Sequence, residues 1–286
     1  MGLPVRTSFE WRLRTRSMPL GKRTVLMGIV NVTPDSFSDG GMLGSVAQVV
    51  DHALWLLDEG ADLVDVGGES TRPGAIALHT DQEQARVLPV LEAILKARPE
   101  AIVSVDTYHA ATARRAAEAG AEIINDVSGL MWDPEMAAVM EETQVGVVLM
   151  HARGRPQEWA GLPPLADAEI LPLVLTGLRE SVRAAETAGV RTERIVIDPG
   201  FGFGKHGAEN FVLHAGLERL GEIALPMLVG TSRKRFLSAE VENRAAGTLA
   251  SGVAAVLSGA HILRVHEVRA MRAATEVADG ILRSNH

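Results

Sequence analysis

Short, strongly apolar runs alternate with longer amphipathic segments along nearly the whole chain. The runs are rich in β-branched residues and apolar on both faces, a pattern typical of parallel strands covered by helices on each side. We predict eight strands, at Val25–Val30, Leu63–Val66, Ile102–Val105, Glu122–Ile124, Gly146–Met150, Ile195–Ile197, Met227–Val229 and Ile262–Val265. Eight strand–helix units without a break in composition favour a closed (β/α)₈ TIM barrel; the alternative is an open sheet with fewer strands.

The length and the N-terminal pattern complete this picture of the fold. The chain has 286 residues, and barrels of this type commonly contain about 250 residues in one unit. We therefore expect a single catalytic domain over residues 1–286. Polar and apolar residues alternate from Phe9 to Arg14, which is strand periodicity. This segment predicts a short N-terminal β-hairpin that closes the bottom of the barrel.

Composition excludes several classes of protein. The formal net charge of -8 leaves no basic face for nucleic acid. Cysteine is absent, which excludes disulfides, thiolate metal sites and a cysteine nucleophile, and fits a reducing compartment. The most apolar stretch, Leu249 to Leu263, is interrupted by polar residues and glycine, and it is shorter than the ~20 residues needed to span a membrane. We expect a cytoplasmic protein.

Nearly every predicted strand ends in polar residues. These are Asn31, Asp65 with Glu69, Asp106, Asn125, Asp126, His151, Asp198, Ser232, Arg233, Lys234, Arg264 and His266. A barrel places such positions around one mouth. Because an unpaired buried charge is costly, charges gather where they meet one another or a ligand. The alternative is that each residue caps a turn or the following helix, and this is weaker for so many strand ends together.

Two loops carry unusual sequence, at residues 31–41 and 67–74. Their glycine and proline residues make both plausible mobile lids, and the alternative is two ordinary surface loops. Arg72 in the second loop suits a phosphate, because its planar guanidinium pairs two oxygens at once.

The candidate nucleotide-binding and zinc-binding motifs each lack a required residue. The segment Gly202–Gly207 satisfies G-x-G-x-x-G, but no acidic residue ends the next strand as dinucleotide binding requires. A Walker A motif fails because Pro199 and His206 occupy required glycine and Ser/Thr positions. A zinc hydrolase of this fold would have His-x-His where Asn31-Val32-Thr33 stands. A hard cation bound by oxygens and a diphosphate remains open.

At the strand ends and loops the chain resembles the dihydropteroate synthase family. The matching segments run in order through most of the sequence: Met27–Gly41, Asp65–Gly74, Ser104–Thr107, Ile124–Gly129, Met150-His151, Asp198–Gly200, Gly202–Lys205, Ser232–Lys234 and Arg264–His266. The resemblance covers the chain from about Met27 to its end. It implies a transferase that condenses 6-hydroxymethyl-7,8-dihydropterin diphosphate with p-aminobenzoate, releasing diphosphate in folate synthesis.

The resemblance also implies roles for individual residues. The implied pterin-binding residues are Asp106, Asn125, Asp198, Lys234, Phe203 and Met150. The diphosphate would meet Asn31, Thr71, Arg72, Arg264 and His266, with Asn31 helping to hold Mg²⁺. The p-aminobenzoate site would comprise Phe37, Thr71, Pro73, Phe203, Ser232, Lys234 and Arg235. Asp106, Lys234, Arg72 and Asn31 would be the catalytic residues, acting through positioning and charge stabilisation and not through a nucleophile.

One departure from the family pattern concerns the second substrate. Relatives usually carry serine directly after Ser-Arg-Lys, whereas this chain has Arg235, so the contact with the p-aminobenzoate carboxylate is open at this position. Sulfonamides mimic p-aminobenzoate in this family, and competitive inhibition is expected.

Two rival functions and the oligomeric state stay open. A pterin-binding methyltransferase barrel would share the pterin pocket but would not need the Thr33–Phe37 lid, Arg72 or the segment Ser232–Lys234. A non-catalytic paralogue would bind pterin without turnover. Relatives are typically homodimers, and the small-residue helix around Ala245–Leu257 suits an interface or, equally, close packing on the barrel.

Overall fold

A computed structural model of the chain describes residues 6–32, 42–69 and 78–284. Its strands are β1 (Phe9–Arg12), β2 (Ser17–Leu20), β3 (Val25–Asn31), β4 (Leu63–Gly67), β5 (Val103–Asp106), β6 (Ile123–Asp126), β7 (Gly146–Met150), β8 (Ile195–Asp198), β9 (Leu228–Val229) and β10 (Ile262–Val265). Four residues of the predicted site lie outside the described residues, namely Phe37, Thr71, Arg72 and Pro73.

Helices separate consecutive barrel strands. They are α1 (Met42–Asp58), α2 (Thr80–Ala97), α3 (Ala110–Glu118), α4 (Met136–Thr143), α5 (Asp167–Thr187), α6 (Glu209–Ala215), α7 (Arg244–Leu257) and α8 (Val268–Ser284). Short 3₁₀ helices cover Trp159–Gly161, Thr192–Arg194 and Leu217–Ile223. Among the helices described, none combines the length and the apolar character that crossing a bilayer requires.

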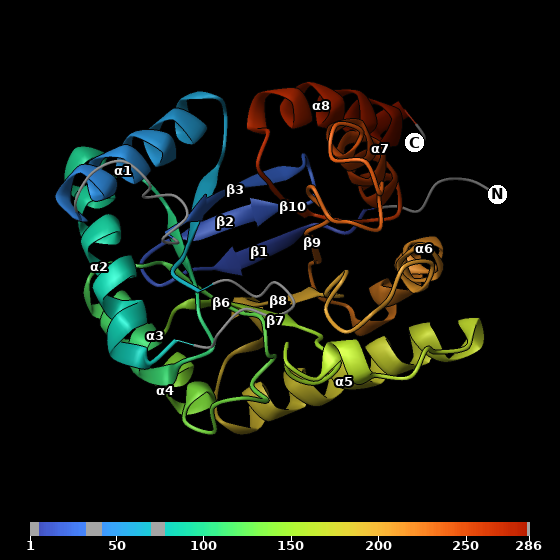
Figure 1. Cartoon of the computed structure of the whole chain (residues 1–286), viewed down its shortest axis with the longest axis horizontal. Coiled ribbons are helices and arrows are strands. Elements are labelled where there is room, and N and C mark those ends of the chain that lie inside the picture. The colour runs from blue at the N-terminus through green and yellow to red at the C-terminus, as the bar shows by residue number, and fades with distance from the viewer. Residues whose placement is uncertain (1–5, 33–41, 70–77, 285–286) are drawn as a thin grey trace.

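Strands β3 to β10 form one parallel sheet that closes on itself. The hydrogen-bonded order is β8-β7-β6-β5-β4-β3-β10-β9, and every neighbouring pair is parallel. The circle closes between β8 and the start of β9, where Ile197 pairs with Met227 and the Ile197 amide donates to the Pro226 carbonyl at 2.9 Å. The helices surround the sheet (Figure 1). The predicted eight-stranded TIM barrel is confirmed, and an open sheet with fewer strands is excluded.

Side chains alternate between two apolar environments along each strand, as the period of two in a β-strand requires. Outward side chains such as Val64, Val103 and Leu263 belong to the large core between the sheet and the helices. Inward side chains near the amino ends of the strands form a second core. It contains Val25, Met27, Leu63, Ile123, Val148, Val196, Leu228 and Ile262.

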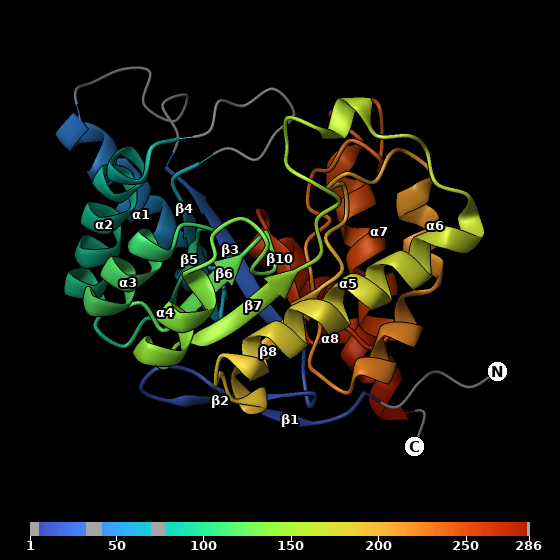
Figure 2. The ribbon, with the colours of Figure 1, turned by 90° about the horizontal axis from the view of Figure 1, so that it is seen from below.

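The N-terminal segment forms the predicted hairpin and fills the bottom of this inner core. β1 and β2 pair antiparallel and lie across the amino ends of the barrel strands (Figure 2). Trp11 and Leu20 are buried within the inner core, and the Trp11 indole nitrogen donates to the Arg194 carbonyl at 2.8 Å. The hairpin prediction is confirmed, and the lower end of the barrel is packed with side chains.

Several polar residues predicted to follow the strands are in fact part of them. Asn31, Asp106 and Asp198 are the last residues of β3, β5 and β8. β6 starts one residue later than predicted and ends two residues later, so that it includes Asn125 and Asp126. Backbone hydrogen bonds to neighbouring strands therefore fix these positions more tightly than a loop would.

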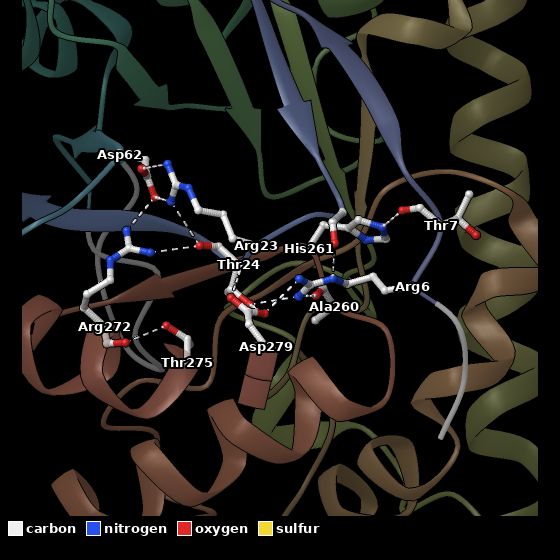
Figure 3. A network of polar contacts seen from close by, with 11 residues as sticks. Arg6, Thr7, Arg23, Thr24, Asp62, Ala260, His261, Arg272, Thr275 and Asp279 are labelled. Carbon is white, nitrogen blue, oxygen red and sulfur yellow. Dashed lines mark hydrogen bonds and ion pairs between the residues drawn. The ribbon is translucent and has the colours of Figure 1, made fainter. Parts of the chain in front are cut away.

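A buried polar network ties the N-terminal segment to the last helix. The Asp279 carboxylate of α8 accepts hydrogen bonds from the Arg6 guanidinium and from both the amide and the hydroxyl of Thr24, each at 2.8 Å (Figure 3). The Arg6 and Asp279 side chains are only 4% and 5% exposed. Because all the partners are buried, the network holds α8 against the start of β3.

We expect Asp279→Ala to lower the free energy of unfolding by about 3–5 kcal/mol, because it strands the buried Arg6 charge. Urea unfolding followed by circular dichroism measures this change. Glu118→Ala is the control: its ion pair with Arg115 is largely exposed, so its effect should stay within about 0.5 kcal/mol. Equal effects for the two variants would contradict a stabilising role for the network.

Candidate active site

One step above the apolar inner core, the inward positions of the barrel become polar. Because side chains alternate with a period of two, each of four strands carries a polar residue two positions after its inner-core residue. The pairs are Leu63 and Asp65, Ile123 and Asn125, Val196 and Asp198, and Ile262 and Arg264. The polar layer therefore sits at the carboxyl ends of the strands, where barrel enzymes have their active sites.

The same rule separates the strand-end residues that face outward. Asp126 follows the inward Asn125, and its carboxylate caps a turn by accepting from the amides of Ser128 (2.8 Å) and Leu130 (2.7 Å). His151 follows Met150 and packs against Gly177 of α5. For these two positions the turn-cap and packing interpretations hold, and neither belongs to the polar layer.

An arginine links Asp65 of this layer to Asp106 at the end of β5. Arg264 donates from Nε to Asp65 Oδ2 at 2.6 Å and from Nη2 to Asp106 Oδ2 at 2.9 Å. Asn125 Nδ2 donates to the same Asp65 oxygen at 3.0 Å. Strand register sets Asp106 directly beside Asn125. Three residues predicted for pterin and diphosphate binding, Asp106, Asn125 and Arg264, are thus one connected cluster.

Burial controls the charge state of Asp106. Desolvation raises the pKa of this carboxyl to about 7, and the negative charges of Asp65, Glu83 and Asp126 act in the same direction. The positive charge of Arg264 opposes them. At neutral pH the Asp106 carboxyl is therefore close to its titration midpoint, which is frequent for groups at functional sites.

Lys234 reaches the layer from the turn after β9. Arg233 adopts the left-handed conformation with φ 58°, a strained backbone for a residue with a side chain, and the turn directs Lys234 toward Phe201 and Phe203. Its ammonium donates to the Phe201 carbonyl and lies 4.5 Å from the centroid of the Phe203 ring. Burial lowers the pKa of Lys234 to about 8, against the attraction of Asp198 and Asp106.

Asp198 is buried at the end of β8, with 6% of its surface exposed. Desolvation raises the pKa of its carboxyl, while Lys234 and the amide of Gly200 favour the charged form. The Gly200 amide donates to Asp198 at 2.7 Å. Gly200 has φ 67°, and a β-carbon there would lie 2.0 Å from the His151 carbonyl oxygen. Only glycine fits this turn, which leads into Phe201 and Phe203, the residues that contact Lys234.

The remaining predicted residues lie around this cluster. Ser232 Oγ is 2.9 Å from His266 Nδ1, so the two strand ends contact each other. Asn31 is exposed at the end of β3, and Arg235 is exposed beyond Lys234. Met150 is buried with Tyr108 and Val127, and Phe203 packs on this group. Met150, Tyr108, Val127 and Phe203 therefore form one apolar group near the charged cluster.

Two residues near the site were not assigned a role from the sequence. Lys205 is buried, and its ammonium donates to the carbonyls of Gly200 (2.8 Å), His151 (3.2 Å) and Phe203 (3.2 Å). Burial lowers its pKa to about 7. Lys205 thereby fixes the backbone on both sides of Phe201, whose carbonyl accepts a hydrogen bond from Lys234. Asp65 is the second, and the period of two from Leu63 would have identified it as inward-facing.

No cluster suited to binding a transition metal is seen among the described residues. In that part of the chain, no group of three or more His, Asp or Glu side chains could hold a metal ion. Asn31 offers an amide oxygen at the mouth, which is a hard donor. The donor set fits Mg²⁺ bound mainly by substrate oxygens and water, because Mg²⁺ needs few protein ligands.

The comparisons with known proteins agree with this geometry. The model of the family described as "Pterin binding enzyme" matches residues 27–266. A dihydropteroate synthase from Bacillus subtilis is 43% identical over 265 residues, covering 91% of this chain and 90% of the relative. The chain belongs to the dihydropteroate synthase family of pterin-binding enzymes.

Solved structures of this family share the fold closely. A dihydropteroate synthase from Xanthomonas albilineans with 4-aminobenzoic acid has a TM-score of 0.87 at 42% identity, covering 96% of this chain and 98% of that one. The same organism's synthase in complex with 7,8-dihydropteroate has a TM-score of 0.83 at 40% identity, covering 95% and 98%. The family resemblance of the strand-end segments is thus confirmed over the whole barrel.

In this member of the family we expect Arg264→Met to raise the pKa of Asp106, because the nearest cation is removed. The expected rise is roughly one to three pH units. Carboxyl ¹³C NMR over a pH series measures it. Arg233→Met serves as the control, since Arg233 pairs with Glu267 at the surface and its loss should leave Asp106 unchanged. A pKa of Asp106 that stays the same in Arg264→Met would contradict the described cluster.

Proposed function

We propose that this chain condenses 6-hydroxymethyl-7,8-dihydropterin diphosphate with p-aminobenzoate to give 7,8-dihydropteroate and diphosphate. The observation that carries the proposal is the convergence of Asp106, Asn125, Asp198 and Lys234 on one end of the barrel, beside Arg264. Such a set offers acceptors and a donor for a flat heterocycle, and a cation for its phosphates. The related synthases with 4-aminobenzoic acid and with 7,8-dihydropteroate support the same pair of substrates.

The polar layer suits the edge of a pterin ring. The ring presents an amino group and N–H donors, for which Asp198, Asn125 and Asp106 supply acceptors. The Lys234 ammonium supplies a donor for the ring oxygen and N5. Because these partners are largely buried, an analogue that lacks one hydrogen-bonding group would leave a buried polar atom unpaired and bind poorly.

The reaction needs a good leaving group and a correctly placed amine. Arg264 and His266, with Thr71 and Arg72, would neutralise the diphosphate as the carbon–oxygen bond breaks and the electron pair leaves with it. The pterin methylene then carries positive charge, which the Asp106 carboxylate stabilises. The neutral arylamine attacks this carbon, and its proton passes to solvent. Positioning and electrostatics suffice, without a nucleophilic residue of the protein.

The second substrate would bind beside Lys234. Phe203, Ser232 and the aliphatic part of Lys234 form the described side of this site, and Arg235 is exposed beside it. The proposed role of Arg235 is to pair with the p-aminobenzoate carboxylate in place of the serine of relatives; the alternative is that it points to solvent.

Mg²⁺ is the proposed metal of the diphosphate site. Asn31 would hold it together with diphosphate oxygens, and when bound it supplies further neutralisation of the leaving group. Arg264 and His266 would orient the same phosphates from the carboxyl end of the neighbouring strand β10.

Diphosphate release tests the proposed function directly. With the pterin diphosphate, p-aminobenzoate and Mg²⁺ together, we expect steady release in stoichiometry with dihydropteroate. Release should fall to the background when p-aminobenzoate is omitted, and it should fall strongly when Mg²⁺ is chelated. Diphosphate release that proceeds equally without p-aminobenzoate would contradict the condensation and indicate a hydrolase.

We expect Asp198→Asn to weaken binding of the pterin diphosphate roughly 10- to 100-fold and to lower turnover with it, because a hydrogen bond to a charged acceptor is lost. Isothermal calorimetry and steady-state kinetics measure the two effects. Asp126→Asn is the matched control, a buried carboxylate at the end of β6 that faces outward and accepts from the Ser128 and Leu130 amides. Near-normal pterin affinity in Asp198→Asn would remove Asp198 from the pocket.

Three other expectations stay predictions. They are the single domain over residues 1–286, the cytoplasmic location, and a homodimer. For the homodimer, α8 carries exposed apolar side chains at Val277 and Ile281, next to α7, which includes the segment Ala245–Leu257.

A further inference from the structure

Asp65 is the most deeply buried charge of the polar layer, yet it lies behind the residues that face the substrate. Its exposed surface is 0%, and it points inward from the middle of β4, where the register sets it beside Ile29 and Ser104. It therefore cannot reach a ligand that sits on Asp106 and Asn125, and any effect on the reaction must pass through its neighbours.

The first neighbour is the amide of Asn125. Its nitrogen donates to Asp65 Oδ2 at 3.0 Å, so the amide oxygen is left on the other side. A carboxamide can donate or accept according to which way it faces. By accepting from the nitrogen, Asp65 commits the oxygen of Asn125 to the pocket, where it can accept from an N–H donor of the ring.

The second neighbour is the guanidinium of Arg264. Asp65 Oδ2 accepts from its Nε at 2.6 Å, while Nη2 of the same group contacts Asp106 at 2.9 Å. Two bonds at different nitrogens fix the plane of the guanidinium. One carboxylate oxygen of Asp65 thus orients a residue on the ring side of the site and a residue on the phosphate side.

The other carboxylate oxygen of Asp65 lowers the stability of the fold. Asp65 Oδ1 is buried without a hydrogen-bond partner among the described residues. An unsatisfied buried carboxylate oxygen destabilises the folded state. Asp65 therefore makes its contacts to Asn125 and Arg264 at the cost of one unpaired oxygen, a cost that the charge of Arg264 offsets in part.

We propose that Asp65 is a positioning residue for the reaction: its buried carboxylate sets the orientation of the Asn125 amide and the Arg264 guanidinium together. The inference rests on the proposed function, since it assigns Asn125 to the pterin ring and Arg264 to the diphosphate. It adds a residue that determines how both halves of one substrate are recognised.

The negative charge of Asp65 has a second effect, on Asp106. The charged groups whose charge acts on Asp106 are Arg264 from β10, Asp65 from β4, Asp126 from β6, Glu83 from α2 and Lys234 from the turn after β9. The carboxylate of Asp65 favours the neutral form of Asp106. Without this charge the pKa of Asp106 falls, so any step that needs the Asp106 carboxylate extends to lower pH.

The test uses the variant Asp65→Asn and two probes, 6-hydroxymethylpterin and inorganic diphosphate, by calorimetry. We expect both affinities to fall roughly 10- to 100-fold, as is usual when the residue that orients a binding group is removed. Asn125→Ala should weaken only the pterin, and Arg264→Met mainly the diphosphate. Unchanged affinity for either probe in Asp65→Asn would overturn the proposal.

The pH profile separates positioning from a general loss of structure. The acid limb of kcat/KM for the pterin diphosphate should move to lower pH by roughly one unit in Asp65→Asn. Glu122→Gln is the control: Glu122 is equally buried, but it accepts from the Thr15 amide at the opposite end of the barrel. An unshifted limb in Asp65→Asn, or an equal shift in Glu122→Gln, would refute the role.

A rescue variant tests the contact with Asn125. In Asp65→Asn/Asn125→Asp the carboxylate and the amide exchange places, so one donor again faces one acceptor. We expect pterin affinity to recover at least tenfold relative to Asp65→Asn alone. No recovery would show that the contact does not act through the amide orientation.

The unmutated protein supplies a measurement that does not depend on a variant folding. In a neutron structure of the protein with bound 6-hydroxymethylpterin, the Asn125 nitrogen should face Asp65 and the oxygen should face a ring donor. The reverse orientation would overturn the proposal. Failure of the unmutated protein to bind pterin at all would instead refute the proposed function.

Discussion

Burying charge inside a closed barrel is tolerable here because one guanidinium serves two carboxylates. Arg264 is bound to Asp65 and Asp106 at once, and desolvating any of the three without the others would be costly. Arg264 comes from β10, whereas its partners come from β4 and β5, and only β3 lies between β10 and β4 in the sheet. The contact therefore depends on the curvature of this part of the sheet, which turns the inward side chains of the three strands toward one another.

The two ends of the barrel interior have different roles: the amino end is an apolar core that stabilises the fold, and the carboxyl end carries the polar residues of the site. At the amino ends of the strands, the hairpin side chains of Trp11 and Leu20 complete an apolar layer. Because this layer fills the barrel, the polar residues two positions further along the strands open only toward the carboxyl ends. The network of Asp279 with Arg6 and Thr24 secures the hairpin end to α8. The strained turn at Arg233 lies at the other end, where the surrounding fold can hold it.

The period of two in the strands explains both what the sequence predicted and what it did not. Apolar runs identified all eight strands, and the polar strand ends identified Asp106, Asn125, Asp198 and Arg264 as neighbours. The runs could not show that Asp126 and His151 face outward, because both predicted strands, Glu122–Ile124 and Gly146–Met150, ended before them. Lys205 was not assigned a role from the sequence because its partners are backbone carbonyls, and residue identity does not reveal which carbonyls a side chain will contact. The turn that carries Lys234 depends on a left-handed Arg233, which residue preference does not predict.

Recognition and ionisation in this site follow from one environment. Burial raises the pKa of Asp106 to about 7 and lowers that of Lys234 to about 8, so each group is moved toward its neutral form. Their mutual attraction opposes this shift but replaces only part of the lost hydration. A ring edge that donates to the carboxylates and accepts from the ammonium would favour the charged forms and supply the missing hydrogen bonds. A ligand without that pattern would have to bind against the desolvation of both groups, so the burial that perturbs their titration is also what makes the pocket selective.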